Sequence, residues 1–153
     1  MARLEKIAEP ERSHLLTLPC PTFNNSPWVI GPPLSKRRLA LISTAGLHRR
    51  KDRPFQAGAS DYRVIPANTA ASDLIMTHIS TNFDRIGFQQ DINIVFPLDR
   101  LRELVDRNII GSLAHYHYSF MGATDPLQLE GTARSLARIM KNDGVNAALL
   151  VPV

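Results

Sequence analysis

The stretch Leu39-Ala-Leu-Ile-Ser-Thr-Ala45, closed by Gly46, decides the fold. Its apolar residues follow one another without polar alternation, which predicts a strand buried on both faces of a parallel sheet. The run Ala147-Ala-Leu-Leu-Val151 has the same character. We therefore expect both strands to be internal to one sheet, and an open edge at either strand would contradict this interpretation.

Between these two runs, strand and helix patterns alternate. Further strands are expected at 62–66, 91–96 and 112–120, and helices at 98–110 and 125–143. Gly111 suits the end of the first helix, while Asp125 and Pro126 suit the start of the second. Ser72 and Asp73 predict the cap of a short helix that runs through His78. The alternation predicts an α/β fold: a Rossmann-like, three-layer domain with a mostly parallel sheet and helices on both faces.

The N-terminal segment has a different composition. Five of the eleven prolines lie between Pro19 and Pro33, and proline removes backbone donors. The sequence therefore predicts a Pro-rich extended arm over 1–38, followed by the N-terminal portion of the α/β domain over 39–153. Trp28-Val29-Ile30 within the arm predicts that it is pinned on its own domain or on a neighbouring subunit, and we expect an oligomer.

Composition excludes several classes of protein. Hydrophobic residues make up 44% and charged residues 21% of 153 residues, which is typical of one globular domain. No apolar run approaches the length of a membrane span, and the N-terminus lacks a secretory signal, so a cytoplasmic protein is expected. Cys20 is the single cysteine, which excludes an internal disulfide and a zinc–thiolate site. The net charge of +4 comes from short basic clusters without interleaved aromatic residues, so nucleic acid is not expected as a partner.

Ligands of parallel sheets bind beyond the carboxyl ends of the strands. The residues expected there form the candidate substrate-binding set: His48, Arg49, Arg53, Arg63, Phe120, Met121 and Gly122. The positive charges suit an anionic ligand, with a solvated basic loop as the alternative. The last three residues also suit a tight turn after a strand. Asp91 and Asn93 share one face of their expected strand, where the carboxylate needs a partner such as Arg63.

The histidines allow two interpretations. His115 and His117 point the same way on an extended strand, and with His78 they would give three nitrogen ligands for a metal. Strand histidines also commonly make only structural hydrogen bonds, and nothing in the sequence fixes the third ligand. We therefore assign no metal to this chain.

Five blocks, in this order, carry a resemblance to a known family: Ser43-Thr-Ala-Gly-Leu-His48, Asp61-Tyr-Arg63, Ser72-Asp-Leu74, Asp91-Ile-Asn-Ile-Val-Phe-Pro97 and His117-Tyr-Ser-Phe-Met-Gly122. From about Leu39 to Val153 the chain resembles the glycine/sarcosine/betaine/D-proline reductase selenoprotein B family. Within that family its character is nearest to the selenoprotein subunit of D-proline reductase.

The resemblance implies reductive C–N bond cleavage of a small amine or amino acid. In the family, a selenocysteine or cysteine with a second cysteine nearby follows a strand like 147–153, so we expect the sequence to stop just before that motif and this chain alone to be inactive. The family chemistry implies no cofactor in this chain and a pyruvoyl group on a partner subunit. His117 belongs to a family block and is the expected proton donor to the leaving amine. A catalytically silent assembly module and a histidine-based metal-binding protein remain the alternatives.

Overall fold

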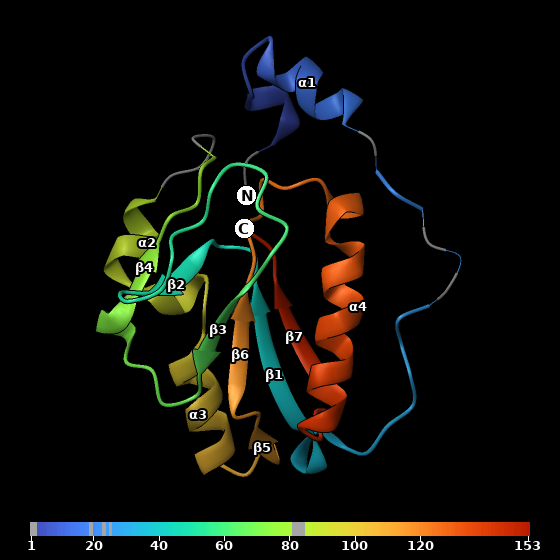
Figure 1. Cartoon of the computed structure of the whole chain (residues 1–153), viewed down its shortest axis with the longest axis vertical. Coiled ribbons are helices and arrows are strands. Elements are labelled where there is room, and N and C mark those ends of the chain that lie inside the picture. Colours follow the sequence, from blue (N-terminus) through green and yellow to red (C-terminus); the bar gives the residue numbers. More distant parts are fainter. Residues whose placement is uncertain (1–2, 19, 23, 25, 81–84) are drawn as a thin grey trace.

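The computed structural model of the chain describes residues 3–18, 20–22, 24, 26–80 and 85–153. Its central element is a five-stranded, mostly parallel sheet within these residues. Strand β1 (Arg38–Ser43) has β7 (Ala147–Val151) on one side, and β5 (Ser112–Leu113) with β6 (Tyr116–Ser119) on the other, all parallel to it. Strand β3 (Arg63–Pro66) pairs antiparallel with β6. The mixed α/β class and the mostly parallel sheet are therefore confirmed (Figure 1).

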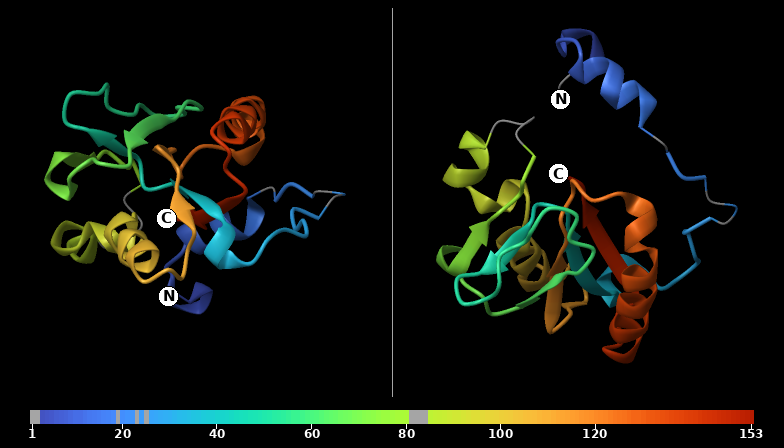
Figure 2. Two further views of the ribbon diagram at one scale, coloured as in Figure 1. Left: turned by 90° about the horizontal axis from the view of Figure 1, so that it is seen from below. Right: turned by 45° about the horizontal axis from the view of Figure 1, so that its top comes forward.

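Strand β1 is buried on both faces, as its sequence predicts. Leu39 and Leu41 pack in the larger hydrophobic cluster with Leu98 and Leu101 of α3 (Leu98–Asp106). Ile42 faces the other way and packs in the smaller cluster with Leu136 of α4 (Pro126–Asn142). Helices α3 and α4 therefore cover opposite faces of β1, because neighbouring side chains on a strand alternate between the faces (Figure 2).

The position of β7 differs from the prediction. Within the described residues β7 pairs with β1 and has no second neighbour, so it lies at an open edge of the sheet. Leu150 is 67% exposed, whereas Leu149, on the opposite face, packs against the larger cluster. The prediction that β7 is internal is wrong for this chain. An apolar run predicts that a strand is buried, but it does not determine which strands pair with it.

Two further elements were predicted incorrectly in type. Residues 91–96 form a 3-10 turn, η4 (Ile92–Ile94), after the short helix α2 (Ile86–Gln90), instead of a strand. The segment through Ser72 and Asp73 forms a 3-10 turn, η3 (Ala71–Asp73), and then strand β4 (Leu74–Met76) instead of a helix. Strand β4 pairs antiparallel with β2 (Leu47–Arg49) in a separate two-stranded sheet.

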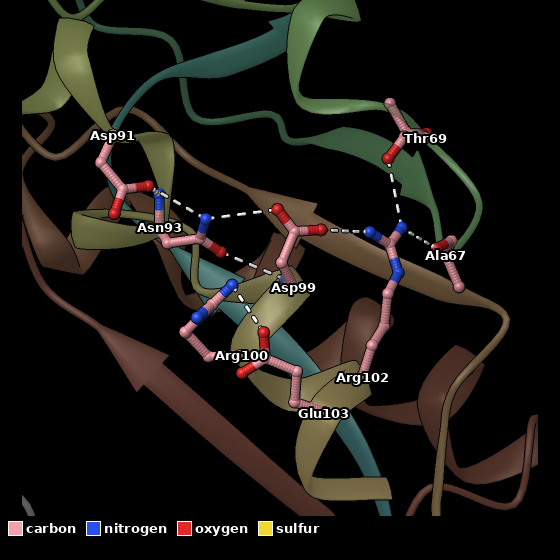
Figure 3. A network of polar contacts seen from close by, with 8 residues as sticks. All are labelled: Ala67, Thr69, Asp91, Asn93, Asp99, Arg100, Arg102 and Glu103. Carbon is pink, nitrogen blue, oxygen red and sulfur yellow. Dashed lines mark hydrogen bonds and ion pairs between the residues drawn. The ribbon is translucent and has the colours of Figure 1, made fainter. Parts of the chain in front are cut away.

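A local polar network explains the turn at 91–96. The Asp91 carboxylate accepts a hydrogen bond from the backbone N of Asn93 at 2.9 Å, which lowers the pKa of Asp91. Asn93 in turn bonds to Asp99 through both side-chain amide atoms, and Arg102 joins Asp99 to the carbonyl oxygens of Ala67 and Thr69 (Figure 3). Short polar side chains that satisfy nearby backbone groups compete with a strand ladder. The expected pairing of Asp91 with Arg63 is therefore wrong.

The two long helices are close to their predicted positions. Helix α4 begins as predicted, with Pro126 in its first turn and the Asp125 carboxylate accepting from Leu127 N at 2.9 Å. Helix α3 ends at Asp106, before the predicted Ile110, and Asn108 adopts a positive φ of 55° after it. Gly111 is therefore not the cap of α3. A Cβ on Gly111 would lie 2.8 Å from the carbonyl oxygen of Arg37, so this glycine permits close backbone packing beside β1.

The N-terminal arm lies apart from the sheet except at its end, where the carbonyl oxygens of Leu34 and Arg37 accept hydrogen bonds from the backbone N of Gly111 and Ser112. It contains η1 (Leu4–Lys6), α1 (Glu11–Thr17) and η2 (Leu34–Lys36), and Figures 1 and 2 show it leaving the body of the domain. Trp28 is 89% exposed, and Val29 and Ile30 are exposed as well, so the predicted docking of this triplet on its own domain is wrong. Docking on a neighbouring subunit stays a prediction, as does the domain boundary at residue 38.

Candidate functional site at the carboxyl edge of the sheet

The site lies where the parallel strands end. The pairing register places Arg63, Ser119, Ser43 and Val151 in one row across β3, β6, β1 and β7. Adjacent strands are about 4.8 Å apart, so Arg63 and Val151 are separated by about 14 Å. Residues immediately beyond this row therefore come from segments far apart in the sequence but lie along one edge.

Hydrogen bonds tie three of these segments together. Thr44, after β1, accepts a hydrogen bond on its Oγ1 from the backbone N of Val153 at 2.8 Å. Its own backbone N donates to the carbonyl oxygen of Val151 at 3.1 Å, and its carbonyl oxygen accepts from Gly122 N at 2.8 Å. The ends of β1 and β7 and the segment after β6 are thus fixed relative to one another. The sequence reasoning missed Thr44, although Thr44 lies inside the first family block.

Gly122 lies at the centre of this edge. A Cβ built on it would lie 2.6 Å from the carbonyl oxygen of Val153, 2.9 Å from His78 Nε2 and 2.9 Å from the carbonyl oxygen of Thr44. All three neighbours are polar, and two of them are backbone atoms that a side chain cannot displace cheaply. Gly122 therefore keeps open a small polar space that His78, Thr44 and Val153 border, which we name the carboxyl-edge cradle.

His78 presents a defined face to the cradle. The side chain is 4% exposed, and its Nδ1 accepts a hydrogen bond from the backbone N of Ser80 at 3.2 Å. A nitrogen that accepts carries no proton, so the proton of the neutral ring is on Nε2, which faces Gly122. Arg85 donates to the carbonyl oxygen of His78 at 2.7 Å. Burial, and secondarily the charge of Arg85, lower the pKa of His78, so the ring is neutral near pH 7.

His117 lies within the sheet and not at its edge. It is fully buried, and its Nδ1 accepts a hydrogen bond from Leu41 N at 3.0 Å, at the point where β1 stops pairing with β5 and has not yet begun to pair with β6. Its ring packs edge-on against Phe96. Burial, and then the charge of Arg102, lower its pKa to about 4. These contacts support a structural role, and the proton-donor role of His117 stays a prediction.

Three of the four basic residues predicted to bind substrate line an open hollow beside the edge. Its volume is about 500 Å³, and Arg49, Arg53 and Arg63 all border it. His48 does not: it is 3% exposed, and its Nδ1 donates to the carbonyl oxygen of Arg49 at 2.8 Å. The structure thus brings together three of the four predicted basic residues.

Two of these arginines are already occupied. Arg63 pairs with Asp61 at 2.7 Å and stacks over the Phe55 ring at 4.2 Å, while Arg49 makes two hydrogen bonds of 2.9 Å to Asp52. Among the described residues the side chains of Arg53 and Lys51 make no hydrogen bond or ion pair with the protein. Arg53 is therefore the predicted residue best able to meet an anion in this hollow.

The turn predicted at 120–122 contributes mainly packing. Met121 is fully buried and forms an isolated bridge with Ala45, and Phe120 packs beside Tyr62. Only Gly122 borders the cradle. Substrate contact by Phe120 and Met121 stays a prediction.

The metal alternative gains no support from this geometry. No three His, Cys, Asp or Glu side chains of the described residues are grouped as a metal site would require. His115 is exposed at the opposite end of β6, away from the cradle. No helix in the part of the chain that the structure describes has the length and apolar character needed to span a membrane.

Comparison with known proteins gives a consistent family. The model of the glycine/sarcosine/betaine reductase selenoprotein B family matches residues 11–153. The D-proline reductase subunit gamma of Acetoanaerobium sticklandii is 34% identical over 120 residues, covering 76% of this chain and 49% of that protein. The sarcosine reductase complex component B subunit beta of Peptoclostridium acidaminophilum is 31% identical over 122 residues, covering 76% of this chain and 28% of that protein.

A third relative extends the match. The glycine reductase complex component B subunit gamma of Carboxydothermus hydrogenoformans is 30% identical over 142 residues, covering 87% of this chain and 32% of that protein. The chain thus spans half or less of the length of these relatives. No solved structure matches it.

Proposed function

The chain belongs to the glycine/sarcosine/betaine reductase selenoprotein B family, and from that premise we propose that it forms part of a subunit of an amine or amino-acid reductase complex. The observation that carries the proposal is the family match over 11–153, which includes every segment of the carboxyl edge. The relatives are themselves named as subunits of D-proline, sarcosine and glycine reductases.

The proposed reaction is reductive cleavage of a C–N bond. A selenolate or thiolate on the residue that follows Val153 attacks the α-carbon of the substrate, a carbon–chalcogen bond forms, and the C–N bond breaks with its electron pair going to the nitrogen. A nearby thiolate then attacks the chalcogen, a proton is added to the released carbon, and an external dithiol reduces the resulting selenenyl-sulfide or disulfide. Only the deprotonated chalcogen is nucleophilic, so its surroundings must favour the anion.

The amine must be activated before the carbon is attacked. A pyruvoyl group on a partner subunit would supply this activation, and we assign no cofactor to this chain. The exposed edge of β7 and the exposed triplet Trp28–Ile30 are the surfaces that we propose for assembly with other subunits. We propose no partner among nucleic acids or membranes.

The substrate carboxylate is assigned to the basic hollow. Arg53 is the principal candidate, because Arg49 and Arg63 are held by Asp52 and Asp61. The position of α3 and α4 on opposite faces of β1 also supports the three-layer, Rossmann-like arrangement, which we include in the proposal. Transfer of a proton from His117 would require the leaving nitrogen of the substrate to reach its fully buried ring.

The simplest test is to read the DNA sequence after the codon for Val153. We expect an in-frame UGA or a cysteine codon, a second cysteine codon within a few positions, and an open frame beyond. An ordinary stop codon with no related frame would contradict the proposed nucleophile and favour a catalytically silent assembly module.

A biochemical test follows from the same assignment. The 153-residue chain, alone, should neither open the ring of D-proline nor release amine from glycine, sarcosine or betaine with dithiothreitol as reductant. The longer gene product, purified with its pyruvoyl-bearing partner, should cleave the C–N bond of one of these substrates, measured as the ring-opened product for D-proline and as free amine for the others. Robust release by the 153-residue chain alone would overturn the assignment of the nucleophile, because its single cysteine, Cys20, lies in the arm.

A further inference from the structure

The carboxyl-edge cradle places one imidazole beside the end of β7. The carbonyl oxygen of Val153 and His78 Nε2 lie 2.6 and 2.9 Å from a single point, the position of a Cβ on Gly122. Two atoms at those distances from one point are at most 5.5 Å apart. A residue joined to Val153 would have its Cα about 3.8 Å from that of Val153, and it would follow the carbonyl group that borders the cradle.

The orientation of Val153 is fixed by the protein. Its backbone N donates to Thr44 Oγ1 at 2.8 Å, and the Thr44 hydroxyl lies 3.3 Å from its carbonyl oxygen. The direction in which the chain leaves β7 is thus set by β1. The orientation of His78 is fixed as well, by the hydrogen bond from Ser80 N to Nδ1 and by Arg85 on its carbonyl oxygen.

We propose that His78 is a positioning residue for the reactive anion: its Nε2–H donates a hydrogen bond to the sulfur or selenium borne by the residue after Val153. This inference rests on the proposed function, which places the nucleophile there. Gly122 is required for the same arrangement, since any side chain at that position would fill the space between His78 and Val153.

His78 is better suited to donate a hydrogen bond through Nε2 than to act as a base there. Because Nδ1 accepts from Ser80 N, the neutral ring offers a proton on Nε2 and no lone pair toward the cradle. A hydrogen bond to the charged form of an acid favours that form and lowers its pKa. The expected result is a larger fraction of the nucleophilic anion at neutral pH.

The test measures a thiol placed at the proposed position. The chain carries Cys20→Ser, which leaves no other thiol, and is extended after Val153 by one cysteine and two small residues. The rate of alkylation by iodoacetamide is followed against pH. With His78 present, we expect the thiol pKa to be at least one unit below the ordinary value of about 8.5, which is roughly tenfold more thiolate at pH 7.

Two substitutions of His78 separate the donor from the rest of the ring. His78→Asn keeps an acceptor near Nδ1 and removes the donor at Nε2, so the thiol pKa should return to its ordinary range. His78→Gln places an amide N–H near the Nε2 position and should restore part of the shift. His115→Asn, at the opposite end of β6, is the matched control and should leave the shift intact. Equal thiol pKa values with His78 and with His78→Asn would overturn the proposal.

A second measurement needs no substitution of His78, so it does not depend on the folding of a variant. In ¹⁵N spectra of the extended chain, the Nε2 resonance of His78 should move as the thiol titrates and should stop doing so after alkylation. An unmoved resonance would overturn the proposal. These outcomes are independent of amine release: a lowered thiol pKa without reductase activity in the complex would contradict the proposed function alone.

Discussion

Two short apolar triplets show how differently the domain and the arm treat similar residues. Leu39-Ala40-Leu41 in β1 is buried, while Trp28-Val29-Ile30 in the arm is exposed to solvent. The residues of β1 have neighbouring strands on both sides and clusters on both faces. Pro27, Pro32 and Pro33 surround the arm triplet and offer no backbone donors. Apolar character therefore leads to burial only where the backbone can also be paired.

The domain should be most sensitive where a buried polar group completes this pairing. His117→Ala removes the acceptor for Leu41 N inside the sheet and leaves a cavity beside Phe96. We expect a loss of about 3 to 4 kcal/mol in the free energy of unfolding, measured by urea titration. The exposed control His115→Ala should change it by less than about 0.5 kcal/mol. Equal effects would mean that the ladder does not depend on His117.

The same histidine should make the domain sensitive to acid. The pKa of His117 is about 4 in the folded protein because of burial, against about 6.5 in the unfolded chain. The unfolded chain therefore takes up the proton first. The stability is complete above pH 6.5 and is lost as the pH falls toward 4.

We expect this single group to account for about 2 kcal/mol of stability lost between pH 7.5 and pH 5. His117→Asn keeps an acceptor but cannot titrate, so the difference between the two pH profiles isolates His117. His78, whose pKa is lowered too, contributes equally to both proteins. If the stability of the two proteins changed in the same way with pH, His117 would be charged or exposed in the folded protein.

At the rim of the domain the expected effect is smaller. Arg63→Gln removes the ion pair to Asp61, the contact over the Phe55 ring and the hydrogen bonds to the carbonyl oxygens of Arg53 and Pro54. We expect the free energy of unfolding to fall by about 1 to 2 kcal/mol, which is measured as a lower melting temperature. Arg53→Gln, in the same hollow, should cost less than about 0.5 kcal/mol. The reverse order would assign the structural role to Arg53.

The arm should give the smallest effect on folding. Trp28→Ala removes an indole that is 89% exposed, so the melting temperature at low protein concentration should not change. Docking of the arm on a neighbouring subunit predicts that the elution volume at high concentration shifts toward a smaller species. If both quantities stay unchanged, the arm is a passive tail; a large fall in melting temperature would mean that it packs on its own domain.

The sequence alone determined the elements that depend on local patterns. The continuous apolar run at β1 and the run at β7 gave their residues, and the Asp125-Pro126 pair gave the start of α4. The ordered blocks also identified the family that the comparisons support. These features need only periodicity, capping chemistry and the order of residues along the chain.

Only the tertiary structure decided which strand lies at an edge and which histidine lies at the site. The open edge of β7 depends on pairing, and the turn after Asp91 depends on a network that reaches Asp99. The carboxyl-edge cradle joins Thr44, His78, Gly122 and Val153, which are widely separated in the sequence. Hydrophobic periodicity shows which face of an element is buried, but not the register that brings distant elements together. That register places His78, and not His117, beside the end of β7.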